Sequence, residues 1–289
     1  MKSIELRLDS DFICTSLETI PFNLSVFPGG EINFRLLGDT DNIISSPCTV
    51  WITQRIKNSD DLMKILMAHD ALKRNKFVKN IELVIPYVPY ARQDRVCNPG
   101  EAFSLKVFCD ILNSCNFNKI HILDAHSDVT PALLKNRVNY DNYGFVKNVV
   151  NRIIISTKEL SIVAPDAEAI KKVYKLVEKL TKDFPEINFS LVTCDKVRNL
   201  STGQIIRTIC HNPEEIKIEC LIVDDICDGG RTVIEVAKTL KMHGAENIIF
   251  AATHGIFSKG FGVFEGYINQ IESTNSFCNG INVNTCYQK

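Results

Sequence analysis

Two adjacent carboxylates, Asp224 and Asp225, follow an apolar run at 221–223 and precede a glycine-containing loop, a combination suited to a phosphorylated sugar. The loop is followed by apolar residues at helical spacing. Backbone N–H groups of such a loop bind phosphate together with the positive end of the next helix. Carboxylates accept hydrogen bonds from hydroxyls or bind magnesium. The loop residues are Asp228, Gly229, Gly230, Arg231 and Thr232.

A second candidate site is the run Pro86-Tyr-Val-Pro-Tyr-Ala-Arg-Gln-Asp94, which follows a predicted strand. Its prolines and aromatic residues indicate a rigid, extended loop that presents Arg92 and Gln93. Arginine pairs with phosphate, and the planar groups of both side chains can stack on a base or bond to it. A surface loop with solvated arginines is the alternative interpretation.

Further charged residues follow predicted strands. His126 and Asp166 each lie just past a strand end, where ligands bind in open α/β sheets. His126 could bind a metal or a phosphate, although a lone histidine is more often structural. Lys196 and Arg198, two residues apart in an extended segment, share a face and could stabilise a transferring phosphoryl group. Ordinary solvated charges are the alternative for this pair.

These residues are expected to lie on an α/β fold. Apolar strand-like runs alternate with amphipathic stretches, which predicts two doubly wound domains with mainly parallel sheets. The polar and aromatic segment at 135–145 breaks this alternation. We therefore expect an N-terminal domain over 1–140 and a C-terminal domain over 141–289.

The composition excludes several classes of protein. The 289 residues carry a net charge of −1 without a strongly basic segment, which disfavours nucleic-acid or anionic-membrane binding. No apolar run is long enough to span a membrane, and the N-terminus lacks a signal-peptide pattern. The 11 cysteines are scattered and form no C-x-x-C pair, which indicates reduced thiols and a cytoplasmic protein.

Together the segments resemble ribose-phosphate diphosphokinases, the phosphoribosyl-diphosphate synthetase family. The run at 86–94 is the most specific match, and 228–232 occupies the place of the family's phosphoribosyl-diphosphate loop. Asp124-Ala-His126 and Asp195-Lys-Val-Arg198 match its metal-site and catalytic-loop segments. Phe27–Glu31 matches its nucleotide loop, except that Gly29 replaces an aspartate. Residues 164–172 match the family's S-P-D-x-G-G-x-x-R segment poorly.

The resemblance implies transfer of the β,γ-diphosphoryl group of ATP to the anomeric hydroxyl of ribose 5-phosphate. It implies Mg2+ near His126 and Asp166, and charge stabilisation by Lys196 and Arg198. It places the ribose hydroxyls at Asp224 and Asp225 and the C5 phosphate at 228–232. The implied ATP ligands are Phe27, Glu31, Arg92, Gln93 and Asp94, the first two supplied across a subunit contact. A homo-oligomer built from dimers, usually a hexamer, is therefore expected.

Two alternatives remain open from the sequence. The family loop usually reads Asp-Thr-x-Gly-Thr, whereas this chain has Gly229 and Arg231, which leaves space and adds a guanidinium. The same chemistry on a 5-substituted ribose such as ADP-ribose would suit that change. An inactive regulatory subunit is the other alternative, favoured by Gly29 and opposed by the retained charged residues. A phosphoribosyltransferase that uses a base is disfavoured by the run at 86–94.

Overall fold

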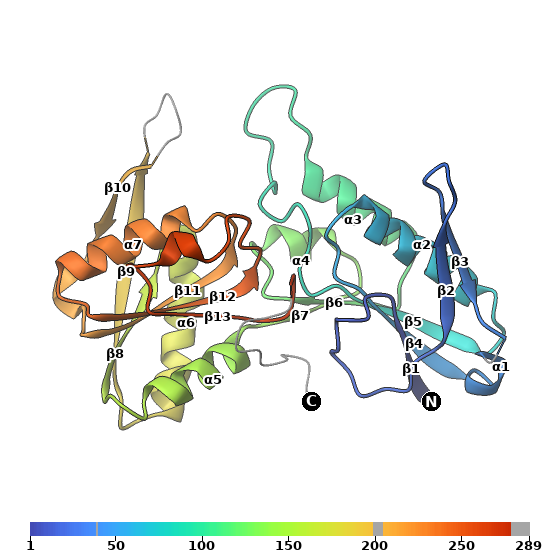
Figure 1. Cartoon of the computed structure of the whole chain (residues 1–289), viewed down its shortest axis with the longest axis horizontal. Coiled ribbons are helices and arrows are strands. Elements are labelled where there is room, and N and C mark those ends of the chain that lie inside the picture. Colours follow the sequence, from blue (N-terminus) through green and yellow to red (C-terminus); the bar gives the residue numbers. More distant parts are fainter. Residues whose placement is uncertain (39, 199–204, 279–289) are drawn as a thin grey trace. The chain divides into compact units, whose positions relative to one another are not determined.

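The computed structural model describes residues 1–38, 40–198 and 205–278, without the side chains of 40–41, 196–198 and 205–207. The chain divides into two compact units, Met1–Asp141 and Asn142–Cys286 (Figure 1). The division lies within the segment 135–145, where the sequence suggests a boundary. Each unit has its own sheet and hydrophobic core, so each is described by itself.

The N-terminal unit is built on a parallel five-stranded sheet in the order β1-β4-β5-β6-β7. A separate antiparallel hairpin pairs β2 with β3. The strands of the main sheet are β1 (Lys2–Arg7), β4 (Cys48–Thr53), β5 (Val78–Val84), β6 (Lys119–Leu123) and β7 (Arg137–Tyr140). The hairpin consists of β2 (Phe22–Val26) and β3 (Ile32–Leu36).

Helices of this unit pack against one face of the sheet. Their apolar residues, such as Ile65 of α2 and Leu105 of α3, share a core with strand residues such as Ile52 and Leu83. Asn58 caps α2 by accepting a hydrogen bond from the Asp61 backbone N–H at 3.0 Å. The helices are α1 (Thr40–Ile43), α2 (Ser59–Lys73), α3 (Ser104–Ser114) and α4 (Val129–Leu133).

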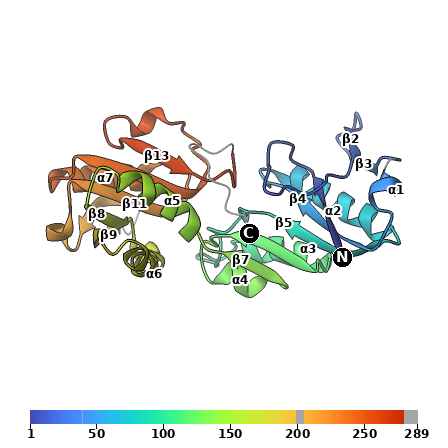
Figure 2. The same ribbon diagram turned by 90° about the horizontal axis from the view of Figure 1, so that it is seen from below.

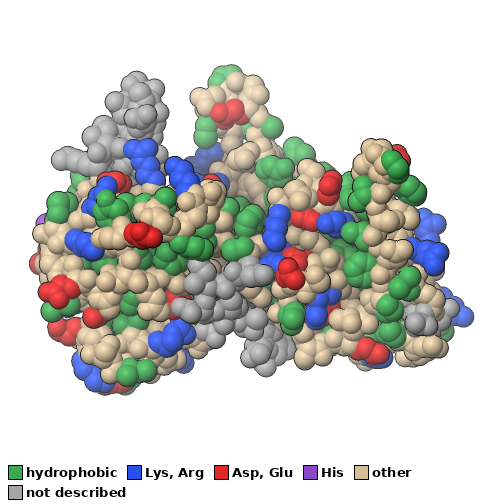
Figure 3. Space-filling model, in the orientation of Figure 1, with side chains coloured by type: hydrophobic (Ala, Val, Ile, Leu, Met, Phe, Trp, Pro, Cys, Tyr) green, Lys and Arg blue, Asp and Glu red, His purple; other side chains and the backbone are tan. Residues whose placement is uncertain are grey.

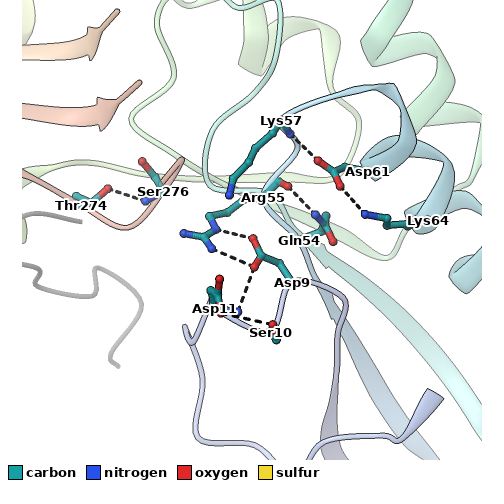
Figure 4. Close-up of polar contacts among 10 residues, drawn as sticks. All are labelled: Asp9, Ser10, Asp11, Gln54, Arg55, Lys57, Asp61, Lys64, Thr274 and Ser276. Carbon is teal, nitrogen blue, oxygen red and sulfur yellow. Dashed lines mark hydrogen bonds and ion pairs between the residues drawn. The ribbon is translucent and has the colours of Figure 1, made fainter. Parts of the chain in front are cut away.

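The opposite face of the N-terminal sheet carries an irregular segment between β1 and β2. Phe12 and Cys14 of this segment pack with Val84 of β5. Just past β4, the guanidinium of Arg55 binds both carboxylate oxygens of Asp9, with Nε–Oδ2 2.6 Å and Nη2–Oδ1 3.0 Å (Figure 4). Because Arg55 is buried, this pair ties the irregular segment to the end of β4.

The C-terminal unit has a six-stranded sheet in the order β10-β9-β8-β11-β12-β13. All neighbouring strands are parallel except β10 and β9, which are antiparallel. The strands are β8 (Glu159–Ala164), β9 (Asn188–Arg198), β10 (Ile205–Cys210), β11 (Glu219–Cys227), β12 (Asn247–Gly255) and β13 (Gln270–Ser273).

Helices cover both faces of this sheet, as Figure 2 shows. One core contains α5 and α6 with Ile162 of β8, whereas the other contains α7 with Ile222 of β11. The helices are α5 (Tyr143–Ile153), α6 (Ala167–Asp183) and α7 (Arg231–Met242), with short 3-10 turns at η1 (Pro213–Glu215) and η2 (Gly262–Phe264). This is a doubly wound arrangement.

The predicted α/β class with mainly parallel sheets is confirmed. Two details differ from the sequence-based expectation. The described helices of the N-terminal unit share one core on one face of its sheet, so the doubly wound description applies to the C-terminal unit. Strand β11 also continues to Cys227, so Asp224 and Asp225 lie within the strand and not after it. Parallel pairing with β12 on one side stabilises this extension.

Surface and thiol properties agree with the composition. On the face drawn in Figure 3, acidic and basic side chains are interspersed. No helix in the described residues has the length and apolar character needed to cross a membrane. The described cysteines are free thiols, and burial raises the pKa of Cys14 and Cys109 to about 12. Such thiols stay protonated at neutral pH, which makes them poor nucleophiles.

Candidate functional site

The predicted sugar-phosphate site lies at the carboxyl end of β11. Asp224 Oδ1 accepts a hydrogen bond from the Asp225 N–H at 2.9 Å, and Asp225 Oδ1 accepts one from the Ile226 N–H at 3.0 Å. Both side chains are partly exposed. Local backbone bonds therefore help to fix the orientation of both carboxyl groups at this end of β11.

Lys172 of α6 adds a cation to this carboxylate pair. Its ammonium lies 3.5 Å from Asp225 Oδ2. The segment 164–172 matches the family pattern poorly, yet it retains a positive charge that reaches the β11 carboxylates. Lys172 therefore lies beside Asp225, a contact that the comparison of segment 164–172 with the family motif did not predict.

The glycine loop connects β11 to α7 with a backbone that requires glycine at position 230. Gly230 has φ +76°, and a Cβ there would lie 2.5 Å from Cζ of Phe264. Both the left-handed backbone and the aromatic ring exclude a larger side chain. Phe264 is buried and packs near Phe250 and Phe257, with ring centroids 6.3 and 6.0 Å away. This cluster of tilted and edge-on rings therefore packs against the glycine loop.

The start of α7 is suited to an anion. Its N-cap residue is Gly230, which has no side chain that could cap the helix. The first turn contains no acidic residue. Arg231 instead occupies the first helical position and is exposed. A cation at the positive end of a helix is unfavourable by roughly 0.3–1 kcal/mol, the reverse of the usual preference. A bound anion would offset that cost.

Asp166 has a structural role in addition to the predicted one. It is the N-cap of α6, and its Oδ1 accepts a hydrogen bond from the Ala169 N–H at 3.1 Å. Lys196 and Arg198 lie near the end of β9, where the backbone pairs antiparallel with β10. Their side chains, and residues 199–204, lie outside the described residues.

In the N-terminal unit the structure joins two of the predicted motifs. Ser127 donates a hydrogen bond to Asp94 Oδ2 at 2.7 Å, and Arg95 Nε donates one to Oδ1 at 3.1 Å. Burial favours a raised pKa for Asp94, but the bonds from Ser127 and Arg95 and the nearby His126 lower it below the ordinary value. Asp94 is therefore ionised and buried, whereas Arg92 and Gln93 beside it are exposed.

His126 lies at the same edge, because β5 and β6 are parallel neighbours. Asp124, at the end of β6, has φ +41°, a backbone conformation that costs energy in a non-glycine residue. Its N–H donates to the Tyr140 carbonyl at 2.7 Å, which fixes the turn that leads to His126. Strain of this kind is frequent at binding sites.

Phe27 and Glu31 lie at the tip of the β2–β3 hairpin. The Phe27 N–H donates to the Glu31 carbonyl at 2.8 Å, and the Gly30 N–H donates to the Phe27 carbonyl at 2.8 Å. The Phe27 side chain is 54% exposed and that of its neighbour Val26 is 61% exposed. The structure therefore brings Phe27 and Glu31 together within one turn.

The described residues of neither unit form a complete metal site. Among the residues that the structure describes, no group of three or more His, Cys, Asp or Glu side chains could hold a metal. Magnesium is commonly bound by one or two protein ligands together with substrate phosphates. His126 and Asp166 are the predicted ligands, and they belong to different units.

A glycine loop after two strand-end aspartates, on a doubly wound sheet, defines the C-terminal unit as a phosphoribosyltransferase-type domain. The phosphoribosyl transferase domain model matches residues 139–278, and the model for the N-terminal domain of ribose phosphate pyrophosphokinase matches residues 10–115. The chain belongs to the ribose-phosphate pyrophosphokinase family.

Individual relatives agree with this assignment. The ribose-phosphate pyrophosphokinase of Mycoplasma pneumoniae is 33% identical over 202 residues, which cover 69% of this chain and 58% of the relative. That of Mycoplasmopsis pulmonis is 28% identical over 261 residues, covering 89% and 77%. The crystal structure of phosphoribosylpyrophosphate synthetase from Mycobacterium smegmatis has a TM-score of 0.74 at 20% identity, covering 96% of this chain and 90% of that chain.

Sequence reasoning missed two site residues, Ser127 and Lys172. Ser127 directly follows His126, and this position next to a predicted metal ligand could have indicated that Ser127 lies at the site. Lys172 stands six residues after Asp166 on the next helix, and a cation facing the sheet edge could have been expected there. Their partners, Asp94 and Asp225, could not be predicted from the sequence, because each bond joins residues more than 30 positions apart.

Proposed function

We propose that this chain transfers the β,γ-diphosphoryl group of ATP to the anomeric hydroxyl of ribose 5-phosphate, giving phosphoribosyl diphosphate and AMP. The observation that carries this proposal is the order Asp224-Asp225, glycine loop and uncapped α7 at one sheet edge. Asp224 and Asp225 would accept bonds from the ribose hydroxyls. The loop 228–232 would bind the C5 phosphate through backbone N–H groups.

The nucleotide side of the proposal rests on the N-terminal unit. Arg92 and Gln93 are exposed on a loop that Asp94 anchors through Ser127, so they are placed to bind ATP. Asp94 would act in ATP binding by holding that loop. Phe27 and Glu31, exposed at a hairpin tip, would contact the ATP bound to a neighbouring subunit. The assembly proposed on this basis is a homo-oligomer built from dimers, such as a hexamer.

Transfer to a hydroxyl needs charge neutralisation and positioning more than covalent chemistry. Lys196 and Arg198 are the proposed catalytic residues, since cations near the end of β9 could stabilise charge on the transferring group. Magnesium bound to the triphosphate would neutralise its oxygens. His126 would ligate it, and so would the Asp166 oxygen that does not cap α6.

A second acceptor, a 5-substituted ribose such as ADP-ribose, is favoured by the position of Arg231. The backbone N–H groups of the loop can bind one phosphate by themselves. The exposed guanidinium of Arg231, at the first residue of α7, adds a positive charge that could bind a second phosphate. Ribose 5-phosphate remains the leading proposal, because the relatives are named ribose-phosphate pyrophosphokinases and the loop of N–H groups suits a single C5 phosphate. The free thiols of the described cysteines support a reducing, cytoplasmic setting.

The test is AMP release from ATP and magnesium with ribose 5-phosphate or ADP-ribose as acceptor. AMP formation that depends on ribose 5-phosphate and stops on chelation is the expected result. AMP formation with ADP-ribose but not with ribose 5-phosphate would overturn the choice of acceptor. Failure with both acceptors would support the inactive regulatory subunit.

A further inference from the structure

A second loop, 256–260, lies along the glycine loop, and its Lys259 has no role in the site described above. After β12, the N–H groups of Ile256 and Phe257 donate to the Cys227 carbonyl at 2.8 and 3.2 Å. The Ser258 N–H donates to the Asp228 carbonyl at 3.2 Å. These bonds hold the start of the 256–260 segment against the entry to the glycine loop.

The next residue, Lys259, lies directly against Gly229. A Cβ built on Gly229 would lie 3.4 Å from Lys259 Cε, 3.5 Å from Cδ and 3.9 Å from Cγ. Three consecutive carbons of the Lys259 side chain therefore lie over the position that a Cβ atom at residue 229 would occupy. These are ordinary van der Waals distances, so the lysine stem packs directly over the backbone at Gly229.

The ammonium of Lys259 is one bond beyond Cε and is therefore close to the glycine loop. The residue is exposed, and within the described part of the chain no hydrogen bond or ion pair holds its ammonium. The positive end of α7 and Arg231 lie at the same loop. The helix end and the Lys259 ammonium both favour an anion at this loop, within which Asp228 is the one carboxylate.

We propose that Lys259 is a further binding residue of the acceptor site, and that its ammonium binds the anionic substituent on C5 of the sugar. The inference rests on the proposed function, because it assigns the 228–232 loop to that substituent. Lysine suits this place, since its flexible stem lies on Gly229 while its compact charge reaches a phosphate oxygen.

The test uses Lys259→Met, which keeps an unbranched stem and removes the charge, and Lys259→Arg, which keeps the charge. Lys182→Met is the matched control, because Lys182 is an exposed lysine in the last turn of α6, at the opposite edge of the sheet. We expect Lys259→Met to raise KM for ribose 5-phosphate about tenfold, the lower end for a hydrogen bond to a charged group. KM for ATP should stay within twofold, and Lys259→Arg should restore most of the loss.

An unchanged KM for ribose 5-phosphate in Lys259→Met would overturn the inference while leaving the proposed function intact. If the wild type transfers nothing to ribose 5-phosphate, the proposed function fails. Lys259 is then judged by calorimetric titration of ribose 5-phosphate into wild type, Lys259→Met and Lys182→Met. Binding that is lost only in Lys259→Met would support the inference, and equal heats in all three proteins, including no heat at all, would overturn it.

Discussion

The hydroxyl of Ser127 lies 2.7 Å from Asp94 Oδ2, and this bond joins two loops that follow neighbouring parallel strands. One loop presents Arg92 and Gln93, and the other carries His126. The bond therefore couples the position of the proposed ATP ligands to the position of the proposed metal ligand. A hydroxyl bond to a buried carboxylate is of the stronger kind, about 1.5–3 kcal/mol.

Ser127→Ala tests this coupling. The loop that presents Arg92 should be less well fixed, so we expect KM for ATP to rise about tenfold while KM for the acceptor changes little. Steady-state kinetics with each substrate varied in turn measures this. Ser10→Ala is a suitable control, because the Ser10 hydroxyl makes a long, exposed contact of 3.5 Å with Asp11. Equal losses in the two variants would contradict the coupling.

Gly230→Ala should damage the glycine loop. The new Cβ would collide with Phe264, and the left-handed backbone adds strain of about 1–3 kcal/mol. Gly266→Ala is a matched control, since Gly266 has the same φ of +76° with open space around its Cβ position. We expect thermal unfolding at a lower temperature and weaker acceptor binding for Gly230→Ala than for the control. Equal unfolding temperatures and equal acceptor binding in the two variants would mean that contact with Phe264 does not determine the loop conformation.

Asp224→Asn should weaken sugar binding more than ATP binding, because the carboxylate is proposed to accept bonds from ribose hydroxyls. Calorimetric titration of each ligand separately distinguishes the two effects. The expected loss for the sugar is about 1.5–3 kcal/mol. A larger loss for ATP would move Asp224 to the nucleotide and metal side of the site.

Lys196→Ala should lower turnover while leaving ATP affinity within a few-fold. A cation that acts on developing charge is needed mainly in the transition state, and a comparable lost donor costs about 2.7–4 kcal/mol. Single-turnover rates together with equilibrium ATP binding measure the two quantities. Turnover near that of the wild type would remove Lys196 from the mechanism.

Asp9→Asn should destabilise the N-terminal unit, because it leaves the buried guanidinium of Arg55 without its carboxylate. Removing one partner of a buried pair costs about 3–5 kcal/mol. Hydrogen exchange of peptides from β1 and β4 measures the effect, and Asp70→Asn provides the control. Arg74 and Asp70 are 76% and 63% exposed, and such pairs contribute about 0.2–1 kcal/mol. Equal protection in both variants would contradict this role.

The same pair predicts a pH dependence. Burial favours a raised pKa for Asp9, but the bond and charge of Arg55 lower it below the ordinary value of a carboxyl group. Because the folded-state pKa is depressed, the stabilisation is complete above the ordinary carboxyl pKa. It is lost as pH falls through the folded-state pKa. Wild type should therefore lose protection in β1 and β4 on acidification, whereas Asp9→Asn should lose less.

Local patterns in the sequence were sufficient for the class of fold and for the family, whereas the roles of the site residues stay predictions. The strands that carry Ile162 and Leu221 are continuous apolar runs, and the run at 86–94 is specific to one family. The second face of the N-terminal sheet was not predictable, since Asp9 and Arg55 meet across 46 residues. Neither was the contact of Lys259 with Gly229, because it depends on how two loops at one sheet edge pack together.

The central claim is that a diphosphoryl group passes intact from ATP to the anomeric oxygen. Phosphorus-31 NMR of a reaction with ATP, magnesium and ribose 5-phosphate tests it most directly. We predict equal amounts of AMP and a sugar that carries a new pair of coupled diphosphate resonances in addition to its C5 phosphate. Formation of ADP with a singly phosphorylated anomeric oxygen, or of free diphosphate without a new sugar diphosphate, would contradict the account.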